Sequence, residues 1–187
     1  MAVKAADLES ELIDGICERV RRKLATDRVA PCESFIRQFY HWVPAVDLSD
    51  RSEIDLYGAA IAEWNLAQQR APGESKVNVY NPDFEQHGWQ SPHTVIEIIS
   101  DDMPFIVDSV TMELGRQGYG IDLVIHPVVR VRRDDAGRLV DVVEPGADPD
   151  GAVAESVIHA EVVRERDKAE LERLRENLER VLGEVRL

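Results

Sequence analysis

Cysteine is scarce in this chain of 187 residues, which contains only Cys17 and Cys32. Two cysteines cannot build the disulfide framework of a small secreted domain, and their spacing fits no zinc-binding motif. We therefore expect both side chains to pack as small apolar groups in a reducing compartment, which predicts a cytoplasmic protein.

The chain also lacks the long apolar segment that a membrane requires and the positive charge that nucleic acid requires. No apolar run approaches the roughly 20 residues of a membrane-spanning helix, and residues 1–11 contain no apolar stretch of a secretory signal. Asp and Glu total 36 against 22 Lys and Arg, so the net charge is −14. The basic groups at 19–23 and 130–133 are both short. We therefore expect neither nucleic acid nor a membrane as a partner.

Recognised catalytic motifs are missing as well. The glycines at 115, 118 and 120 have the reverse of the G-x-G-x-x-G spacing, and they lie at the end of a predicted helix and not at its start. A dinucleotide site needs its glycines before a helix, where free N–H groups bind the pyrophosphate. Walker A, HExxH and G-x-S-x-G strings are absent too. We therefore expect no catalytic residue, no cofactor-binding residue and no metal ligand in this segment.

The pattern of residues 1–72 predicts a helical N-terminal segment. Apolar residues recur every four positions between 7 and 25, which indicates an amphipathic helix. Pro31 is expected to open a second helix, because a proline costs no hydrogen bond in the first turn. Asp50 is expected to cap a third helix, with Glu53 completing a capping box.

Residues 73–187 change to a strand-rich pattern, which predicts a second domain. The expected order is strand 76–80, strand 94–100, helix 104–117, strand 120–133, strand 138–143, strand 155–164 and helix 167–186. Pro127 cannot donate to a ladder, so its strand is placed at a sheet edge. From residue 94 onwards this order is five-sixths of a ferredoxin-like, ACT-like βαββαβ unit, an α+β fold with an antiparallel sheet and helices on one face. The domain is therefore expected to be truncated at its C-terminal end or to take its last strand from elsewhere.

The turn that follows the apolar strand is the candidate binding site. Asp101, Asp102, Met103 and Pro104 join the end of that strand to the start of a helix. The free N–H groups and the positive dipole end of a helix can hold a carboxylate, and an adjacent Asp can hold an ammonium group. Together these features suit a free amino acid. The alternative, which the residues alone favour, is that Asp101 or Asp102 simply caps the helix.

The histidines form no convincing ligand pattern. His87 and His93 are expected to be loop residues that bond to backbone groups, while His126 and His159 are expected to be structural residues on strands. The bulkiest aromatic residues are expected in a core or an interface: Trp42, Trp64 and Trp89.

Four strings between Phe39 and Arg133 carry a resemblance: FYHWVPAVDLSDR, IDLVIHPVVRVRR and the two unusual strings NPDFEQHGWQSPHT and DDMPFIVDSVTMEL. They resemble the N-terminal region of the large bacterial NAD-specific glutamate dehydrogenases, and the similarity continues more loosely to the end of the chain. The resemblance implies a multidomain enzyme that converts L-glutamate, NAD and water to 2-oxoglutarate, ammonia and NADH. It implies ACT-like domains in this N-terminal part and a catalytic, NAD-binding part farther downstream.

The ligand turn of ACT domains often reads Asp-x-Pro-Gly before the first helix. By resemblance, Asp102, Met103 and Pro104 match its first three positions, and Phe105 replaces the glycine that would let a ligand approach the backbone. Phe105 is therefore expected to crowd the site. Replacing Phe105 with glycine is expected to lower the stability of the domain by roughly 2 kcal/mol or more, because apolar burial is lost. Asp102 is expected to cap the helix, a contribution of about 1 kcal/mol.

Two functions follow from the resemblance. The first is a non-catalytic regulatory or assembly segment, whose partners are other domains of the same long chain and further copies of it. Copies are expected to pair through strand 120–133 or the apolar stripe of helix 167–186. The alternative is an amino-acid sensor that controls the enzyme through the 101–105 turn. A third interpretation is a free-standing enzyme, but the sequence shows no nucleophile–base pair that would support it.

Overall fold

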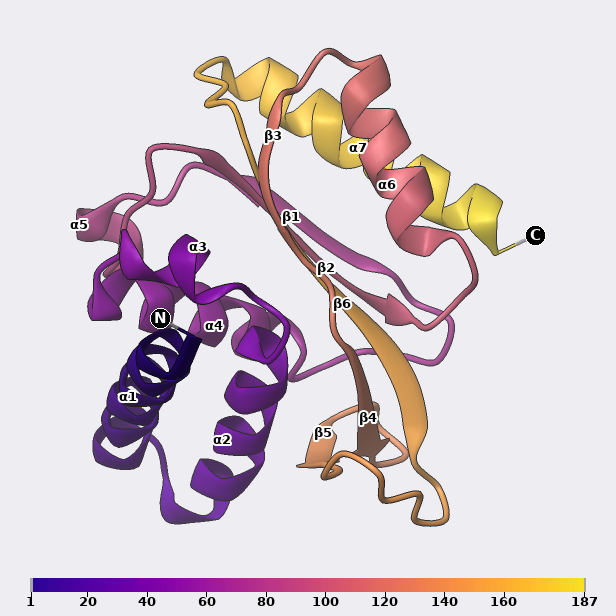
Figure 1. Ribbon diagram of the computed structural model, residues 1–187. Coiled ribbons are helices and arrows are strands. Elements are labelled where there is room, and N and C mark those ends of the chain that lie inside the picture. The colour runs from indigo at the N-terminus through magenta and orange to yellow at the C-terminus, as the bar shows by residue number, and fades with distance from the viewer. Residues whose placement is uncertain (1, 187) are drawn as a thin grey trace.

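The computed structural model describes residues 2–186, and the side chains of residues 7–186, as helices packed on both faces of one sheet (Figure 1). The helices are α1 (Ala2–Lys23), α2 (Thr26–Tyr40), α3 (Ala45–Ser49), α4 (Glu53–Leu66), α5 (Phe84–His87), α6 (Ile106–Arg116) and α7 (Lys168–Val185). The strands are β1 (Lys76–Tyr80), β2 (Thr94–Asp101), β3 (Ile121–Ile125), β4 (Val128–Arg133), β5 (Leu139–Val142) and β6 (Val153–Val162). No helix among the described residues is both long and apolar enough to cross a membrane.

The strands form one six-stranded sheet in which every pair is antiparallel. The order is β1-β2-β6-β4-β5, and β3 also pairs with β6. The centre of the sheet is the β2–β6 pair, whose register runs from Thr94 opposite Val162 to Asp101 opposite Glu155. The predicted α+β class with an antiparallel sheet is confirmed.

Pro127 divides the segment that was expected to be one strand. β3 ends at Ile125 and β4 begins at Val128, and both pair with β6. The carbonyl of Pro127 still accepts a hydrogen bond from the N–H of Val157 at 3.0 Å. The edge prediction is correct for β3 but wrong for β4, because β5 covers the outer side of β4.

Each face of the sheet has its own hydrophobic core, because strand side chains alternate between faces. Ile98 and Ile158 pack with α6 and α7, whereas Ile99 and Val157 pack with α1, α2 and α4. Figure 1 shows α6 and α7 on one side of the sheet and the N-terminal helices on the other. The helical N-terminal segment therefore shares a continuous core with the sheet.

The apolar stripe of helix α7 is buried against other elements of the same chain. Leu174, Leu178 and Leu182 are fully buried against α6 and the sheet. Asp167 caps the helix by accepting a hydrogen bond from the N–H of Ala169 at 2.8 Å. The stripe is thus not the unpartnered surface that the sequence predicted for pairing between copies.

Two expected helix starts in the N-terminal segment are wrong. Pro31 lies inside α2, which begins at Thr26, because the burial of Cys32 and the packing of Val29 extend the helix in both directions from the proline. The cap of α4 is Ser52, whose hydroxyl accepts a hydrogen bond from a backbone N–H at 3.1 Å. Asp50 instead ends α3, two residues too early to reach those N–H groups.

Candidate functional site

The turn predicted to bind an amino acid joins β2 to α6, and its acidic groups already have partners. Asp101 forms ion pairs with Arg70 at 2.8 Å and with Arg186 at 3.3 Å. Asp102 accepts a hydrogen bond from the hydroxyl of Ser156 at 2.8 Å. Both carboxylates therefore connect the turn to other parts of the chain.

Neither aspartate caps α6. The residue before the helix is Phe105, which offers no side-chain acceptor, and the N–H of Ile106 donates to the carbonyl of Met103 at 3.4 Å. Pro104 is exposed, and Met103 packs at the edge of the core beneath α6. The cap predicted for Asp102 is wrong because the chain needs three further residues before the helix begins.

Phe105 has the backbone conformation that glycine prefers. Its φ is 65°, and it is the only non-glycine residue with a positive φ among the residues that the structure describes. The left-handed conformation costs an ordinary residue about 1–2 kcal/mol. The side chain is 75% exposed, so it does not pack under α6.

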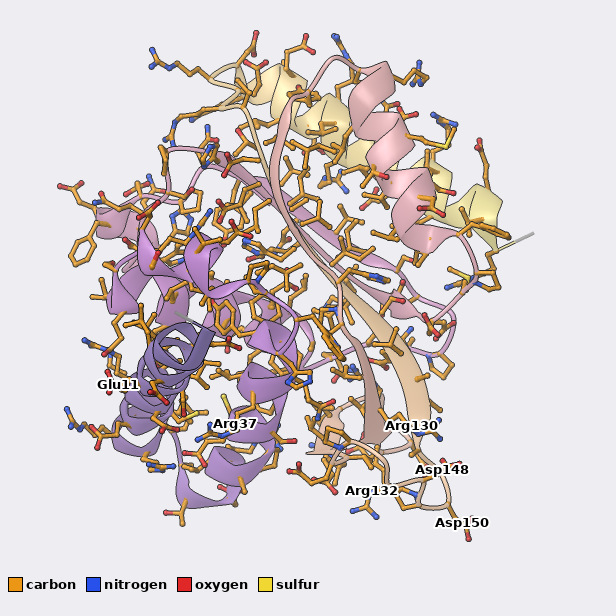
Figure 2. All side chains as sticks on the ribbon, in the orientation of Figure 1. Glu11, Arg37, Arg130, Arg132, Asp148 and Asp150 are labelled. Atoms are coloured by element: carbon orange, nitrogen blue, oxygen red, sulfur yellow. The ribbon has the colours of Figure 1, made fainter. Side chains whose placement is uncertain are left out.

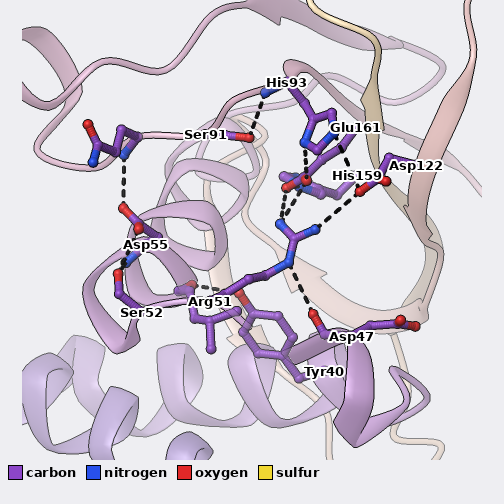
Figure 3. A network of polar contacts seen from close by, with 12 residues as sticks. Tyr40, Asp47, Arg51, Ser52, Asp55, Ser91, His93, Asp122, His159 and Glu161 are labelled. Carbon is purple, nitrogen blue, oxygen red and sulfur yellow. Dashed lines mark hydrogen bonds and ion pairs between the residues drawn. The ribbon is translucent and has the colours of Figure 1, made fainter. Parts of the chain in front are cut away.

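A polar cleft of about 450 Å³ lies on the face of the sheet that the N-terminal helices cover, where α3 and α4 approach β3 and β6. Arg51, in the short connection between α3 and α4, reaches into it (Figure 3). Its Nη1 donates to both oxygens of Glu161 at 2.7 Å, and its Nε donates to the carbonyl of Asp47 at 3.1 Å. Asp122 of β3 lies 3.6 Å from the same guanidinium.

His93 lines the cleft from the loop before β2. Its Nδ1 lies 3.5 Å from Glu161, and its Nε2 lies 3.6 Å from Asp122. The backbone of this loop is held by Ser91, whose hydroxyl accepts from the N–H of His93 at 3.1 Å. The cleft thus has both a cation and acidic groups on its walls.

A buried polar cluster continues inward from the cleft. The Nε2 of His159 lies 3.2 Å from Glu161, and its Nδ1 lies 3.6 Å from Glu63 of α4. Glu97 of β2 completes the cluster and accepts hydrogen bonds from Tyr80 at 2.8 Å and from Asn78 at 3.3 Å. The cluster therefore lies between the helical layer and the sheet.

Burial and pairing shift the protonation of this cluster. Burial alone would raise the pKa of Glu161, but its contacts with His159 and Arg51 lower the pKa to about 2. Burial alone would lower the pKa of His159, but its contacts with Glu161 and Glu63 raise the pKa to about 9. Burial raises the pKa of Glu63 to about 8. Glu161 therefore stays ionised at neutral pH, between the guanidinium of Arg51 and the ring of His159.

A second buried network joins the loop after α4 to the sheet. Arg70 donates to Glu155 from Nε at 3.0 Å and from Nη2 at 2.6 Å. Arg133 of β4 donates to both oxygens of Glu155, at 2.7 and 2.8 Å. Charges this deeply buried are tolerated only when they are paired, so this network is best explained as a structural connection.

Two groups of side chains have the composition of a metal site. One consists of Glu63, Glu97 and His159, and the other of His93, Asp122 and Glu161. In each group the ligand atoms lie within 4.8 Å of one another. In the second group Arg51 already neutralises Glu161, which disfavours a cation there.

The two cysteines pack as the composition predicted. Cys17 and Cys32 are free and fully buried in the core beneath the N-terminal helices. Burial raises the pKa of Cys32 to about 12. Such a thiol is not a reactive nucleophile.

The arginines of the 130–133 group all have acidic partners. Arg130 pairs with Asp148, and the two side chains lie together at the far end of the sheet (Figure 2). Arg132 pairs with Asp141 at 2.9 Å, and Arg133 belongs to the buried network of Glu155.

Neither the buried cluster nor the cleft was predicted from the sequence. Glu97 and Glu161 stand in strands whose neighbouring residues are nearly all apolar. A charged residue in a strand that is buried on both faces requires a buried partner, and this is the signal that identifies it. Arg51 carried no signal, because only the tertiary packing brings its loop to β6.

The comparisons with known proteins agree with the resemblance. The family model described as "Glutamate dehydrogenase, ACT1 domain" matches residues 35–178. The NAD-specific glutamate dehydrogenase of Halomonas elongata is 44% identical over 176 residues, which are 94% of this chain and 11% of that protein. The enzyme of the same name from Pseudomonas aeruginosa is 35% identical over all 187 residues, again 11% of its length. The chain thus spans about a ninth of the curated relatives it matches, and it belongs to the glutamate dehydrogenase ACT1 domain family.

Proposed function

We propose that this chain is a non-catalytic assembly and regulatory segment of an NAD-specific glutamate dehydrogenase. The whole enzyme would convert L-glutamate, NAD and water to 2-oxoglutarate, ammonia and NADH in the cytoplasm. Support comes from the names of the two relatives and from the small share of their length that the chain covers. The catalytic residues and the NAD site would lie in the rest of the enzyme.

We further propose that the fold is a permuted ferredoxin-like unit of the ACT type. β2, α6, β3 with β4, β6 and α7 follow the expected order of strand, helix, strand, strand and helix. β1 lies antiparallel on the outer edge of β2, where a ferredoxin-like sheet has its last strand. In this arrangement the chain supplies its own closing strand from the N-terminal side.

The observation that carries the assembly function is an exposed tryptophan beside a groove. Trp42, between α2 and α3, is 83% exposed, whereas Trp64 and Trp89 are buried. The groove has a volume of about 570 Å³, and Pro127, Val128 and Pro145 are among its lining residues. Tryptophan is enriched at the energetic centres of interfaces, and an isolated domain gains nothing by exposing it.

The proposed occupant of this groove is another domain of the same long chain. The relatives contain about eight further segments of this size, so the whole enzyme offers a covering surface without a separate partner. Copies of the enzyme would also pair through the free edge of β3, where Ile121 is exposed.

The lack of an NAD site is supported by the position of the glycines. Gly118, with φ of 82°, follows the C-terminal end of α6. The C-terminal end of a helix presents carbonyl groups and the negative end of the dipole, which repel a pyrophosphate. Calorimetric titration of the chain with NAD should therefore show no saturable binding.

The decisive experiment mixes the 187-residue chain with the remainder of the enzyme as a separate polypeptide. We expect binding, and we expect Trp42→Ala to weaken it at least about tenfold, as for an interface hot spot. The matched control is Met112→Ala, which removes another exposed apolar side chain, from α6 on the opposite layer. Absence of binding, or equal weakening by both substitutions, would show that the Trp42 groove is not the docking surface.

Amino-acid sensing at the 101–105 turn is the second candidate function. The exposure of Phe105 favours it, because a side chain that is 75% exposed is not packed against the start of α6. The ion pairs of Asp101 with Arg70 and Arg186 count against it, because they occupy the carboxylate that would hold an ammonium group. Titration with a panel of free amino acids separates the two functions: saturable binding that Asp102→Ala abolishes would establish the sensor.

A further inference from the structure

We propose that Glu63, Glu97 and His159 form a buried binding site for one divalent transition-metal ion, with Zn²⁺ as the best fit. The three ligands come from α4, β2 and β6, so that the helical layer supplies one and the sheet supplies two. This inference goes beyond the assembly function and does not depend on it.

The spacing of the three side chains suits a shared ion. Bonds from Zn²⁺ to histidine nitrogen and carboxylate oxygen are about 2.0–2.2 Å long, so two donors on one tetrahedral ion lie about 3.3 Å apart. The Glu63 oxygen and the Nδ1 of His159 are 3.6 Å apart. The ligand atoms of all three residues lie within 4.8 Å of one another.

Unpartnered buried atoms point to a ligand at this place. Both carboxylate oxygens of Glu63 and the Nδ1 of His159 are buried without a hydrogen-bond partner. Glu63, Glu97 and His159 are at most 1% exposed. Leaving three such atoms unsatisfied is costly, and a cation shared among them would satisfy all three.

The surrounding residues are arranged as the outer shell of a metal site. His159 turns its second nitrogen, Nε2, towards the carboxylate of Glu161 at 3.2 Å, the arrangement that orients a ligating histidine. Arg51 in turn fixes Glu161 with two hydrogen bonds. On the other side, the hydroxyl of Tyr80 donates to Glu97 at 2.8 Å, which orients the second carboxylate.

The charges of the cluster balance with a divalent ion. Arg51 neutralises Glu161, which leaves Glu63 and Glu97 as two negative ligands beside a neutral imidazole. A histidine nitrogen with two carboxylate oxygens favours Zn²⁺ over Mg²⁺ or Ca²⁺, which prefer oxygen ligands alone.

Such an ion would connect the two layers of the fold. It would join α4 to the central strand pair at the inner end of the cleft, where His159 is part of the lining. Bound only by the folded chain, it would raise the stability of the native state by mass action.

The test uses the 187-residue chain after dialysis against a chelator. Zn²⁺, Mn²⁺ and Co²⁺ are added separately, and bound metal is counted by mass spectrometry after gel filtration. We expect one Zn²⁺ per chain, a rise in the unfolding temperature with Zn²⁺ concentration, and a visible absorption spectrum for the Co²⁺ form that shows nitrogen and oxygen ligation.

Two substitutions test the assignment to these residues. Glu63→Gln keeps the shape of the side chain but removes its charge, and we expect affinity for Zn²⁺ to fall on the order of 100-fold or more. Tyr80→Phe removes only the hydrogen bond to Glu97, and we expect a fall of about tenfold. Circular dichroism of the metal-free variants checks that both fold; if Glu63→Gln does not, the Tyr80→Phe result decides.

The matched control is His93→Gln, which changes the neighbouring group of His93, Asp122 and Glu161. We expect this variant to bind Zn²⁺ like the parent chain. Loss of the metal in His93→Gln with binding retained in Glu63→Gln would place the ion in the outer group and overturn the proposal. Absence of stoichiometric metal on the parent chain would also overturn it.

Discussion

Arg70 and Glu155 are 85 positions apart in the sequence and meet at 2.6 Å, with side chains that are 2% and 1% exposed. Arg70 belongs to the loop that leaves the helical segment, and Glu155 belongs to the central strand β6. Arg133 contacts the same carboxylate, so one acidic group holds two arginines. The end of the helical segment is thereby fixed to the sheet by charge as well as by the shared hydrophobic core.

Arg70→Met is expected to lower the free energy of unfolding by about 3 kcal/mol. Removing one member of a buried pair leaves the other charge with less compensation, and Glu155 retains only Arg133. Urea denaturation followed by circular dichroism measures the difference.

The control for this substitution is Arg132→Met, which breaks the more exposed pair of Arg132 with Asp141. Surface pairs contribute less than about 1 kcal/mol, so its effect is expected to stay below that value. Equal effects of the two substitutions would show that the burial of the Arg70 pair does not matter.

Phe105→Gly is expected to give a chain that is more stable than Phe105→Ala by about 1 kcal/mol. Both substitutions remove the same exposed ring, but only glycine adopts the φ of 65° without strain. Comparison of the two unfolding free energies isolates the backbone contribution. A more stable alanine variant would mean that the left-handed conformation does not persist in solution.

The loss of roughly 2 kcal/mol in stability that the sequence suggested for Phe105→Gly is no longer expected, because the Phe105 side chain buries little surface.

The helices and strands that were predicted correctly are those whose secondary structure is determined by their own residue pattern. Helix α7 repeats leucine at helical spacing, and β2 carries four β-branched apolar residues in a strand that is almost wholly buried, so local pattern and burial agree in both. The helix start predicted at Pro31 was wrong, because α2 already begins at Thr26. A proline marks the start of a helix only where packing does not extend the helix on the N-terminal side of the proline. Pro127 correctly placed β3 at a sheet edge, but the division of the expected strand at this residue was not predicted. One sequence also does not reveal that β5 would cover β4.

The candidate site was harder to predict because its residues come together only through tertiary packing. Glu63 and His159 lie on a helix and a strand far apart in sequence, and their contact depends on how α4 lies across the sheet. The turn at 101–105 could be located because a strand and a helix flank it. The partners of Asp101 and Asp102 could not be predicted, since Arg70 and Ser156 reach them from other elements.

Asp102→Ala is expected to destabilise the chain by about 1–2 kcal/mol, through Ser156 and not through a helix cap. The substitution leaves the buried hydroxyl of Ser156 without its acceptor at 2.8 Å. Ser156→Ala in the same chain removes that unsatisfied hydroxyl, so the double variant is expected to be less destabilised than the sum of the single variants. A double-mutant cycle of urea denaturations measures this coupling. Strict additivity would favour a separate role for Asp102 at the start of α6.

Stability is expected to fall as the pH drops through the range in which histidine titrates, and His126→Gln is expected to reduce this fall. Burial lowers the pKa of His126 from its ordinary value of 6.5, while the carboxylates of Asp102 and Asp108 oppose the shift only in part. The unfolded chain therefore binds a proton at His126 more readily than the folded chain, so the stabilisation is present above pH 6.5 and is lost as the pH falls below it. The Nε2 of His126 is buried without a hydrogen-bond partner, which leaves an added proton unsatisfied. Urea denaturation of both chains from about pH 7.5 to about pH 5 gives the comparison. Parallel stability curves for the parent and the variant would assign the pH dependence to other groups.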